Sequence, residues 1–176
     1  MVARRGDRAV QQSQRSHKTR GRPDIPKIGR GLPSARAGEP PPPEFLVGID
    51  EFNTGRYYAC HETLEALWVV ERDPIRYLYQ GILQIGVGLY HHSRGNYRGA
   101  TSLLRRGMGL LPPFTPRSLG VDVEKLLRES QRCYDILVAL GPDRMGELDL
   151  ALLPKVRLVA GAEPSRASDD GEALSR

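Results

Sequence analysis

The sequence has little of what marks several large classes of protein. Of its 176 residues, two are cysteines and one is tryptophan. Two cysteines do not make the disulfide framework on which many small secreted domains depend, so we expect Cys60 and Cys133 to be reduced thiols in the core. No apolar run reaches the roughly 20 residues of a membrane-spanning helix. No signal-peptide core is found near Met1. These absences favour a cytoplasmic protein without a membrane partner.

The sequence also lacks the short motifs that identify common enzymes. It contains no G-x-S-x-G nucleophile elbow, no P-loop and no glycine-rich dinucleotide fingerprint. The alternation of polar and apolar residues that is typical of β-strands is missing, and so is any internal repeat. We therefore expect an all-α fold whose function is not revealed by a standard catalytic motif.

Charge is distributed unevenly along the chain. Residues 1–43 contain ten Lys or Arg but three Asp or Glu, whereas the rest is slightly acidic. This segment has few large apolar residues and ends in four prolines, so it is predicted to be a disordered basic tail. A nucleic-acid arm is one interpretation, but no aromatic residues lie among the charges to stack on bases. A solvated extension is favoured, and residues 161–176 are expected to be a second disordered tail.

The domain between these tails, residues 44–160, shows helical periodicity. Apolar residues recur every three or four positions in five segments, 44–52, 57–71, 75–93, 97–111 and 122–140. The third segment is apolar on most sides, so it should lie in the middle, where its glycines let a neighbouring backbone approach. Residues 148–160 are compatible with a short helix or an extended strap. Short connections between the segments predict a small antiparallel bundle of about five helices.

His61, Glu65 and Trp68 are the most informative residues. Their spacing of i, i+4 and i+7 places all three on one helical face with Leu64, so that face is predicted to turn inward. Polar groups on an apolar face need partners, because burying them unpaired is costly. The next segment carries a matching polar line, formed by Gln80, Gln84 and His91. The sequence therefore predicts a buried polar site between its second and third helices.

The stretch Phe52–Trp68, which contains these residues, resembles the signature of the domain of unknown function family 309. The hallmark of that family is H-x-x-x-E-x-x-W, and a second block, Tyr79–Gln84, is similar to the family's next segment. With its continuation from His91 to Ala100, the resemblance covers about residues 45–111. It implies a small all-helical bacterial or archaeal domain.

The resemblance also implies a metal role for the His and Glu of the hallmark, here His61 and Glu65. From the residues themselves, a His and a Glu one helical turn apart can bind a single ion. We expect His91 as the third ligand, with Glu62 and Gln84 as weaker alternatives. A His-Glu-His set with an open position would suit zinc or another divalent transition metal. Gln80, Gln84 and Trp68 would then line the space for a bound ligand. The chain departs from the family at Ala59, where Glu is often found and could add a ligand.

A catalytic version of the site would use Glu65 as a general base with His61 or His91 as its partner. Apolar surroundings would raise the pKa of Glu65 towards neutrality, and metal-assisted hydrolysis is the reaction class that such a site would perform. Arg98, Arg105 and Arg106 could meet an anion, although their pattern is typical of a solvated helix face.

Three functional interpretations are therefore open. One is a helical metal or small-ligand site, with or without hydrolytic activity. Another is a non-enzymatic structural or interaction module, in which the polar residues satisfy one another and only fix the packing. The third is a nucleic-acid-associated protein that acts through its basic tail. A homo-oligomer is compatible with each of them.

Overall fold

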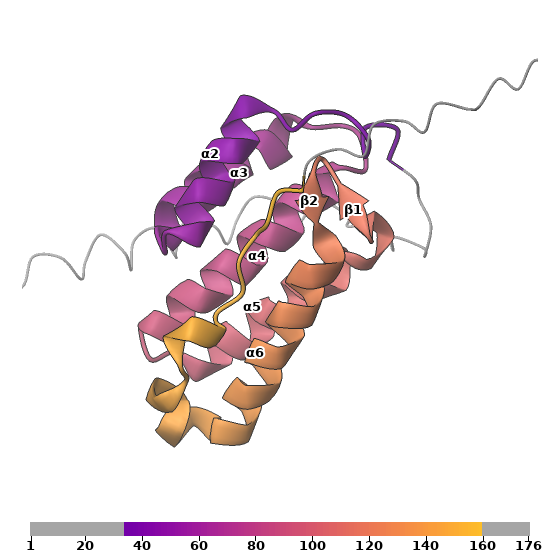
Figure 1. The fold of residues 1–176 in the computed structure, drawn as a ribbon. Helices are drawn as coiled ribbons and strands as arrows, with labels where there is room; N and C mark the ends of the chain where they lie inside the picture. The colour runs from indigo at the N-terminus through magenta and orange to yellow at the C-terminus, as the bar shows by residue number, and fades with distance from the viewer. Residues whose placement is uncertain (1–33, 160–176) are drawn as a thin grey trace, which may run out of the picture.

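A computed structural model of the chain describes residues 34–159. Most of the predicted N-terminal tail and the whole C-terminal tail lie outside these residues. The described part contains five α-helices, which are α2 (Pro43–Asn53), α3 (Tyr57–Val70), α4 (Arg76–Ser93), α5 (Tyr97–Leu110) and α6 (Val123–Arg144). Helices α2 and α3 form a pair at one end, while α4, α5 and α6 make up the body of the bundle (Figure 1). The prediction of an all-α bundle is confirmed, and four of the five helices match their predicted bounds within one residue.

The helix ends follow the chemistry of the residues found there. The side chain of Asn96 accepts a hydrogen bond from the backbone N–H of Gly99, and that of Asp122 accepts one from Lys125, each at 2.9 Å. Both side chains therefore cap helix N-termini, as their residue types favour. Near the end of α6, Gly141 has φ 72° and breaks the regular helix. This left-handed conformation suits glycine, which has no Cβ to clash.

Helix α4 lies between α3 and α5 and supplies much of the core. The side chains of Leu78, Ile82, Ile85 and Leu89 are almost completely buried. Its contact with α5 is unusually close, because glycines face each other across it. A Cβ added at Gly107 would lie 2.7 Å from the carbonyl oxygen of Gly81. The predicted role of the α4 glycines, which is to admit a neighbouring backbone, is therefore confirmed at this position.

The connection between α5 and α6 and the end of the domain contain short elements that periodicity did not predict. They are the 3-10 helices η1 (Pro112–Phe114), η2 (Met145–Glu147) and η3 (Leu150–Leu152) and the paired strands β1 (Arg117–Ser118) and β2 (Val121–Asp122). The C-terminal strap, residues 153–159, is extended and returns along the bundle to β2, where Leu158 bridges Val121 (Figure 1). The ambiguity over residues 148–160 is thus resolved, for the described residues 148–159, as one 3-10 turn followed by a strap.

Asn53 fastens the C-terminal strap to the end of α2. Its side-chain amide donates to the carbonyl oxygen of Val156 at 2.7 Å, and its oxygen accepts from the N–H of the same residue at 2.9 Å. This two-point bond joins segments about a hundred residues apart. Asn53, part of the family-like signature, is therefore a structural residue.

The packed part of the chain begins earlier than the predicted domain boundary at residue 44. Ser34 bonds Asp73, and Arg36 pairs with Glu71 at the junction between α3 and α4. The carbonyl oxygen of Ala37 accepts a hydrogen bond from the backbone of Leu119 at 2.8 Å. Residues 34–42, which composition assigned to the disordered tail, therefore lie on the bundle.

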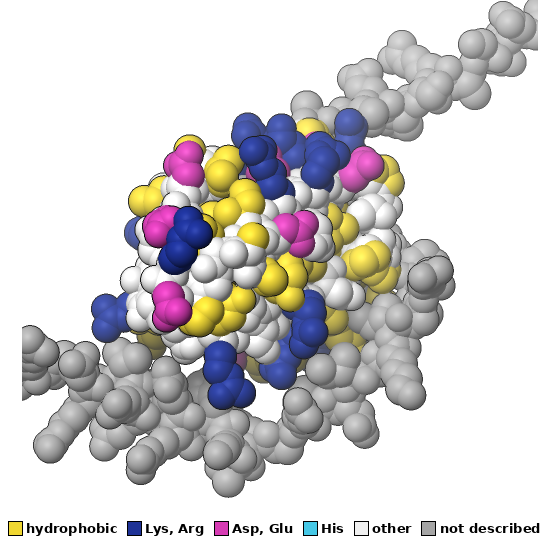
Figure 2. Space-filling model, turned by 90° about the horizontal axis from the view of Figure 1, so that it is seen from below, with side chains coloured by type: hydrophobic (Ala, Val, Ile, Leu, Met, Phe, Trp, Pro, Cys, Tyr) yellow, Lys and Arg dark blue, Asp and Glu magenta, His cyan; other side chains and the backbone are white. Residues whose placement is uncertain are grey.

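Charged and apolar side chains are intermingled on one face of the bundle (Figure 2). On the face shown in Figure 2, small groups of hydrophobic side chains lie between basic and acidic ones. Among the described residues, no helix is both long enough and apolar enough to cross a membrane.

Candidate functional site on the outer side of α4

The stripe of His61, Glu65 and Trp68 on α3 is half-exposed, although the sequence predicted it to be buried. The His61 and Glu65 side chains are 27% and 38% exposed, and His61 Nδ1 lies 3.9 Å from Glu65 Oε2. The inward side of α3 is instead formed by Tyr57, Cys60 and Leu64. The prediction that His61 and Glu65 are buried was wrong because within residues 34–159 no further helix packs over them, and α6 packs against α5 instead.

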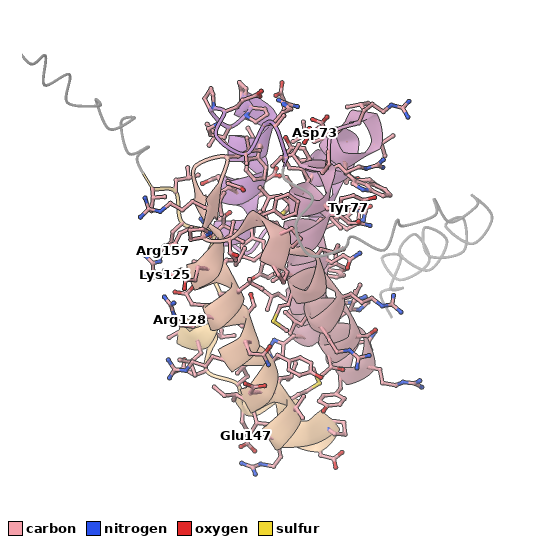
Figure 3. The ribbon with its side chains drawn as sticks, turned by 90° about the vertical axis from the view of Figure 1, so that its right-hand side faces the viewer. Asp73, Tyr77, Lys125, Arg128, Glu147 and Arg157 are labelled. Atoms are coloured by element: carbon pink, nitrogen blue, oxygen red, sulfur yellow. The ribbon has the colours of Figure 1, made fainter. Side chains whose placement is uncertain are left out.

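The neighbouring residues of α4 complete this surface. We use the term outer face of α4 for Arg76, Gln80, Gln84, Val87 and His91, which helical spacing places on one side of the helix. The adjacent Tyr77 lies at the edge of the molecule away from Lys125 and Arg128 of α6 (Figure 3). Trp68 borders this face directly, since the guanidinium carbon of Arg76 is 5.2 Å from the centre of its ring. That distance is within the range of a cation–π contact.

Several polar atoms on this surface have no hydrogen-bond partner among the described residues. They are Trp68 Nε1, Arg76 Nε, Gln80 Oε1 and Gln84 Oε1, and each of these atoms is buried. Leaving such an atom unpaired costs about 1–3 kcal/mol. The set includes donors and acceptors. The predicted network, in which the glutamines and their neighbours satisfy one another, is therefore not complete in the isolated chain.

His91 lies in the last turn of α4, next to the connection to α5. Its Nδ1 lies 3.0 Å from Asn96 Nδ2, and the oxygen of the same Asn96 side chain accepts from Gly99. The Asn96 amide therefore presents its N–H to the ring, so Nδ1 must act as an acceptor. Burial lowers the pKa of His91, which agrees with a neutral ring. His91 is thus committed to local structure.

The predicted three-ligand metal centre is not assembled. Within residues 34–159, no group of three or more His, Cys, Asp or Glu side chains comes together as metal ligands would. The structure keeps the His61–Glu65 pair but does not add His91 to it. The physical reason is that His91 lies at the far end of α4, where its ring packs beside Gly99 of α5.

Two residues near the site were missed by sequence reasoning. Glu51 of α2 is only 8% exposed and accepts a hydrogen bond from Thr63 Oγ1 at 2.8 Å, which ties α2 to α3. Arg76, whose position at a helix start gave no signal, contacts Trp68.

The thiol of Cys60 lies on the inward side of α3. Burial, with a smaller contribution from Glu51, raises the pKa of Cys60 to about 12. A thiol with this pKa is not a nucleophile near neutral pH.

The fold and the site define a small helical-bundle domain with a half-open polar and aromatic surface. Residues 45–103 match the family model of the Domain of unknown function (DUF309), which confirms the resemblance predicted from the sequence. The chain is also similar to the Uncharacterized protein YpuF of Bacillus subtilis (strain 168), with 34% identity over 98 residues. That alignment covers 53% of this chain and 56% of the relative, so the chain spans about half the length of the curated protein it matches.

Proposed function

We propose that this domain is a non-enzymatic interaction module that self-associates through the outer face of α4 and the bordering stripes of α3 and α5. The observation that carries this proposal is the gathering of four buried, unpaired polar atoms on one side of the bundle. Half-buried apolar side chains, among them Trp68, Tyr77 and Val87, lie in the same region. A surface that combines aromatic side chains with unused hydrogen-bonding groups is typical of protein interfaces.

The charges of the two bordering helices complement each other. Helix α3 contains Glu62 and Glu65 but no Lys or Arg, whereas α5 contains three Arg and no Asp or Glu. The α5 stripe beside the outer face is formed by Gly99, Leu103, Arg106 and Leu110, because a Cβ at Gly99 would touch the His91 ring. The α3 border is therefore acidic and the α5 border is basic. Helix α4 between them contains one Lys, Arg, Asp or Glu residue, which is Arg76.

This arrangement suits packing against a second copy of the chain. A two-fold axis parallel to α4 would place α3 of one copy opposite α5 of the other, and would bring Glu65 towards Arg106. An axis perpendicular to α4 would set α3 against α3, with like charges opposed. Because a two-fold interface is self-complementary and opposite charges favour association, the parallel axis is preferred.

The size of the surface is compatible with a modest dimer. Helices α3 and α5 have 14 residues each and α4 has 18. At about 1.5 Å per residue and roughly 9 Å between axes, three such helices present on the order of 600 Å². Stable dimers bury about 800 Å² on each partner. We therefore expect concentration-dependent association.

Sedimentation velocity of the full chain over a range of concentrations tests this proposal. The 19.6 kDa chain should approach twice its mass as the concentration rises. Glu65→Arg and Arg106→Glu should each weaken association, and the double variant should restore it, because the pair is regained with its charges exchanged. Arg128→Glu on α6 makes a matched charge change elsewhere and should have no effect. A chain that stays monomeric, or a double variant weaker than both single ones, would contradict the proposal.

A small ligand or divalent cation at the His61–Glu65 pair is the second candidate. The 3.9 Å separation of His61 Nδ1 and Glu65 Oε2 favours it, together with the unpaired atoms nearby. Calorimetric titration with Zn²⁺ would show stoichiometric binding that Glu65→Gln removes. The geometry does not favour hydrolysis by this pair, because the Glu65 side chain is 38% exposed and a general base of this kind would need a buried position.

A further inference from the structure

We propose that a cleft between α5 and α6 binds an oxyanion of the phosphate type, at a site separate from the outer face of α4. The cleft has a volume of about 220 Å³ and is open to solvent. It is lined by Arg98, Thr101, Ser102 and Arg105 of α5 and by Tyr134 of α6. Two arginines and three residues with hydroxyl groups therefore line one space, and no acidic residue is among them.

The charge at this cleft is not neutralised by the described part of the protein. Arg98 and Arg105 are seven residues apart, so they lie two turns apart on the same side of α5. Neither side chain forms an ion pair with a carboxylate within residues 34–159. Like charges at this spacing repel each other, and a bound anion would offset the repulsion. Guanidinium groups also match the oxygens of a phosphate in a two-point arrangement.

The hydroxyl groups add donors to this positive site. Thr101 Oγ1 is already used, since it donates to the carbonyl oxygen of Tyr97 at 2.9 Å. Ser102 and Tyr134 are half-buried, and their hydroxyls make no hydrogen bond with another described residue. Both can donate to a ligand. A tetrahedral anion with several acceptor oxygens would satisfy these donors together with the guanidinium groups.

The volume limits what the cleft can hold. Sites for drug-sized molecules usually start at roughly 300 Å³. The cleft is smaller than this and open on one side, so it fits a free phosphate ion or the terminal phosphate group of a larger molecule. The structure also separates three arginines that look alike in the sequence, because Arg106 does not line the cleft although it follows Arg105 directly.

The test is a titration of the full chain at constant ionic strength, in which NMR of the backbone amides monitors binding. The probes are inorganic phosphate and adenosine 5′-monophosphate, and potassium chloride is the control anion. We expect saturable shifts at the amides of residues 98–105 and of Tyr134. Binding should weaken at least tenfold in the Arg98→Ala/Arg105→Ala variant. Arg128→Ala/Arg132→Ala, which removes two exposed charges outside the cleft, should change the affinity less than twofold.

The outcomes separate the two sources of phosphate. Equal affinity for both probes would support a site for the free ion, and tighter binding of the nucleotide would support a terminal phosphate group. The Arg98→Lys/Arg105→Lys variant keeps the charge and should bind with intermediate affinity. Equal losses in the cleft and control variants would show general charge attraction and overturn the proposal. Shifts no larger than those caused by chloride would overturn it as well.

Discussion

The two sides of helix α4 differ in how completely their side chains are packed and paired. On the side towards the bundle, Leu78, Ile82, Ile85 and Leu89 are at most 1% exposed, and their burial is a main source of the stability of the domain. On the outer side, Gln80 and Gln84 carry buried oxygens without partners among the described residues. The first side obeys the ordinary rule for a core, and the second violates it. Violations of this kind are expected where a protein keeps groups for binding.

The largest expected effect comes from truncating the inner side. Ile82→Ala should lower the free energy of unfolding by about 2–5 kcal/mol, because it opens a cavity in a fully buried position. Val87→Ala on the outer side is the matched control and should cost about 1 kcal/mol or less. Urea denaturation at low protein concentration measures both. Similar losses in the two variants would show that the two sides do not differ as described.

A smaller effect is expected where α4 meets α5. Gly107→Ala would place a Cβ 2.7 Å from the backbone oxygen of Gly81, so the helices must move apart at a cost of about 1–3 kcal/mol. Gly109→Ala on the same helix meets no atom within 4 Å. It should stabilise the domain by up to about 1 kcal/mol, through the higher helix propensity of alanine. Thermal denaturation of the pair gives the comparison, and equal stability would contradict the close approach.

Gln84→Met tests the outer side of α4 with two measurements, the stability of the monomer and the strength of self-association. The first should stay the same or rise, and the second should fall. Replacing an unpaired buried oxygen by an apolar group of similar length should leave the stability of the monomer unchanged or raise it by up to about 1 kcal/mol. Self-association should weaken, because the second copy loses a hydrogen-bond partner. Denaturation and sedimentation measure the two effects. A destabilised monomer would mean that Gln84 is already satisfied within the chain.

The smallest effect concerns pH. Burial lowers the pKa of His91 in the folded chain below its ordinary value of 6.5, so the unfolded chain takes up a proton first as the pH falls. The contribution of the neutral His91 ring to the free energy of unfolding is therefore complete above about pH 6.5. It is lost as the pH falls towards the lower pKa of the folded chain. His91→Asn should remove this part of the pH dependence. Denaturation curves at pH 7.5 and 5.5 compare the variant with the parent chain, and an unchanged difference would exclude His91 as its source.

Much of the fold could be predicted because it depends on local features of the sequence. The spacing of apolar residues placed the five helices, and residues of types that favour turns, Asn96, Gly55 and Gly141, lie near the helix ends. The buried residues of α2, Phe45, Ile49 and Phe52, show the same spacing. These features depend on neighbours within a few residues, which a sequence displays directly.

The candidate site could be located from the sequence but not completed. The spacing of His61, Glu65 and Trp68 determined that they share one helical face, whatever surrounds it. Whether that face is buried depends on which helix packs over it. The spacing of apolar residues does not reveal this, because it is the same for a face covered by the chain itself and for one covered by a partner. The sequence also does not show which distant segments come together, as Arg98 of α5 and Tyr134 of α6 do in the cleft. Sequence alone determined which residues share a face, and only the tertiary structure decided what that face meets, because burial and pairing are set by contacts between residues far apart in the chain.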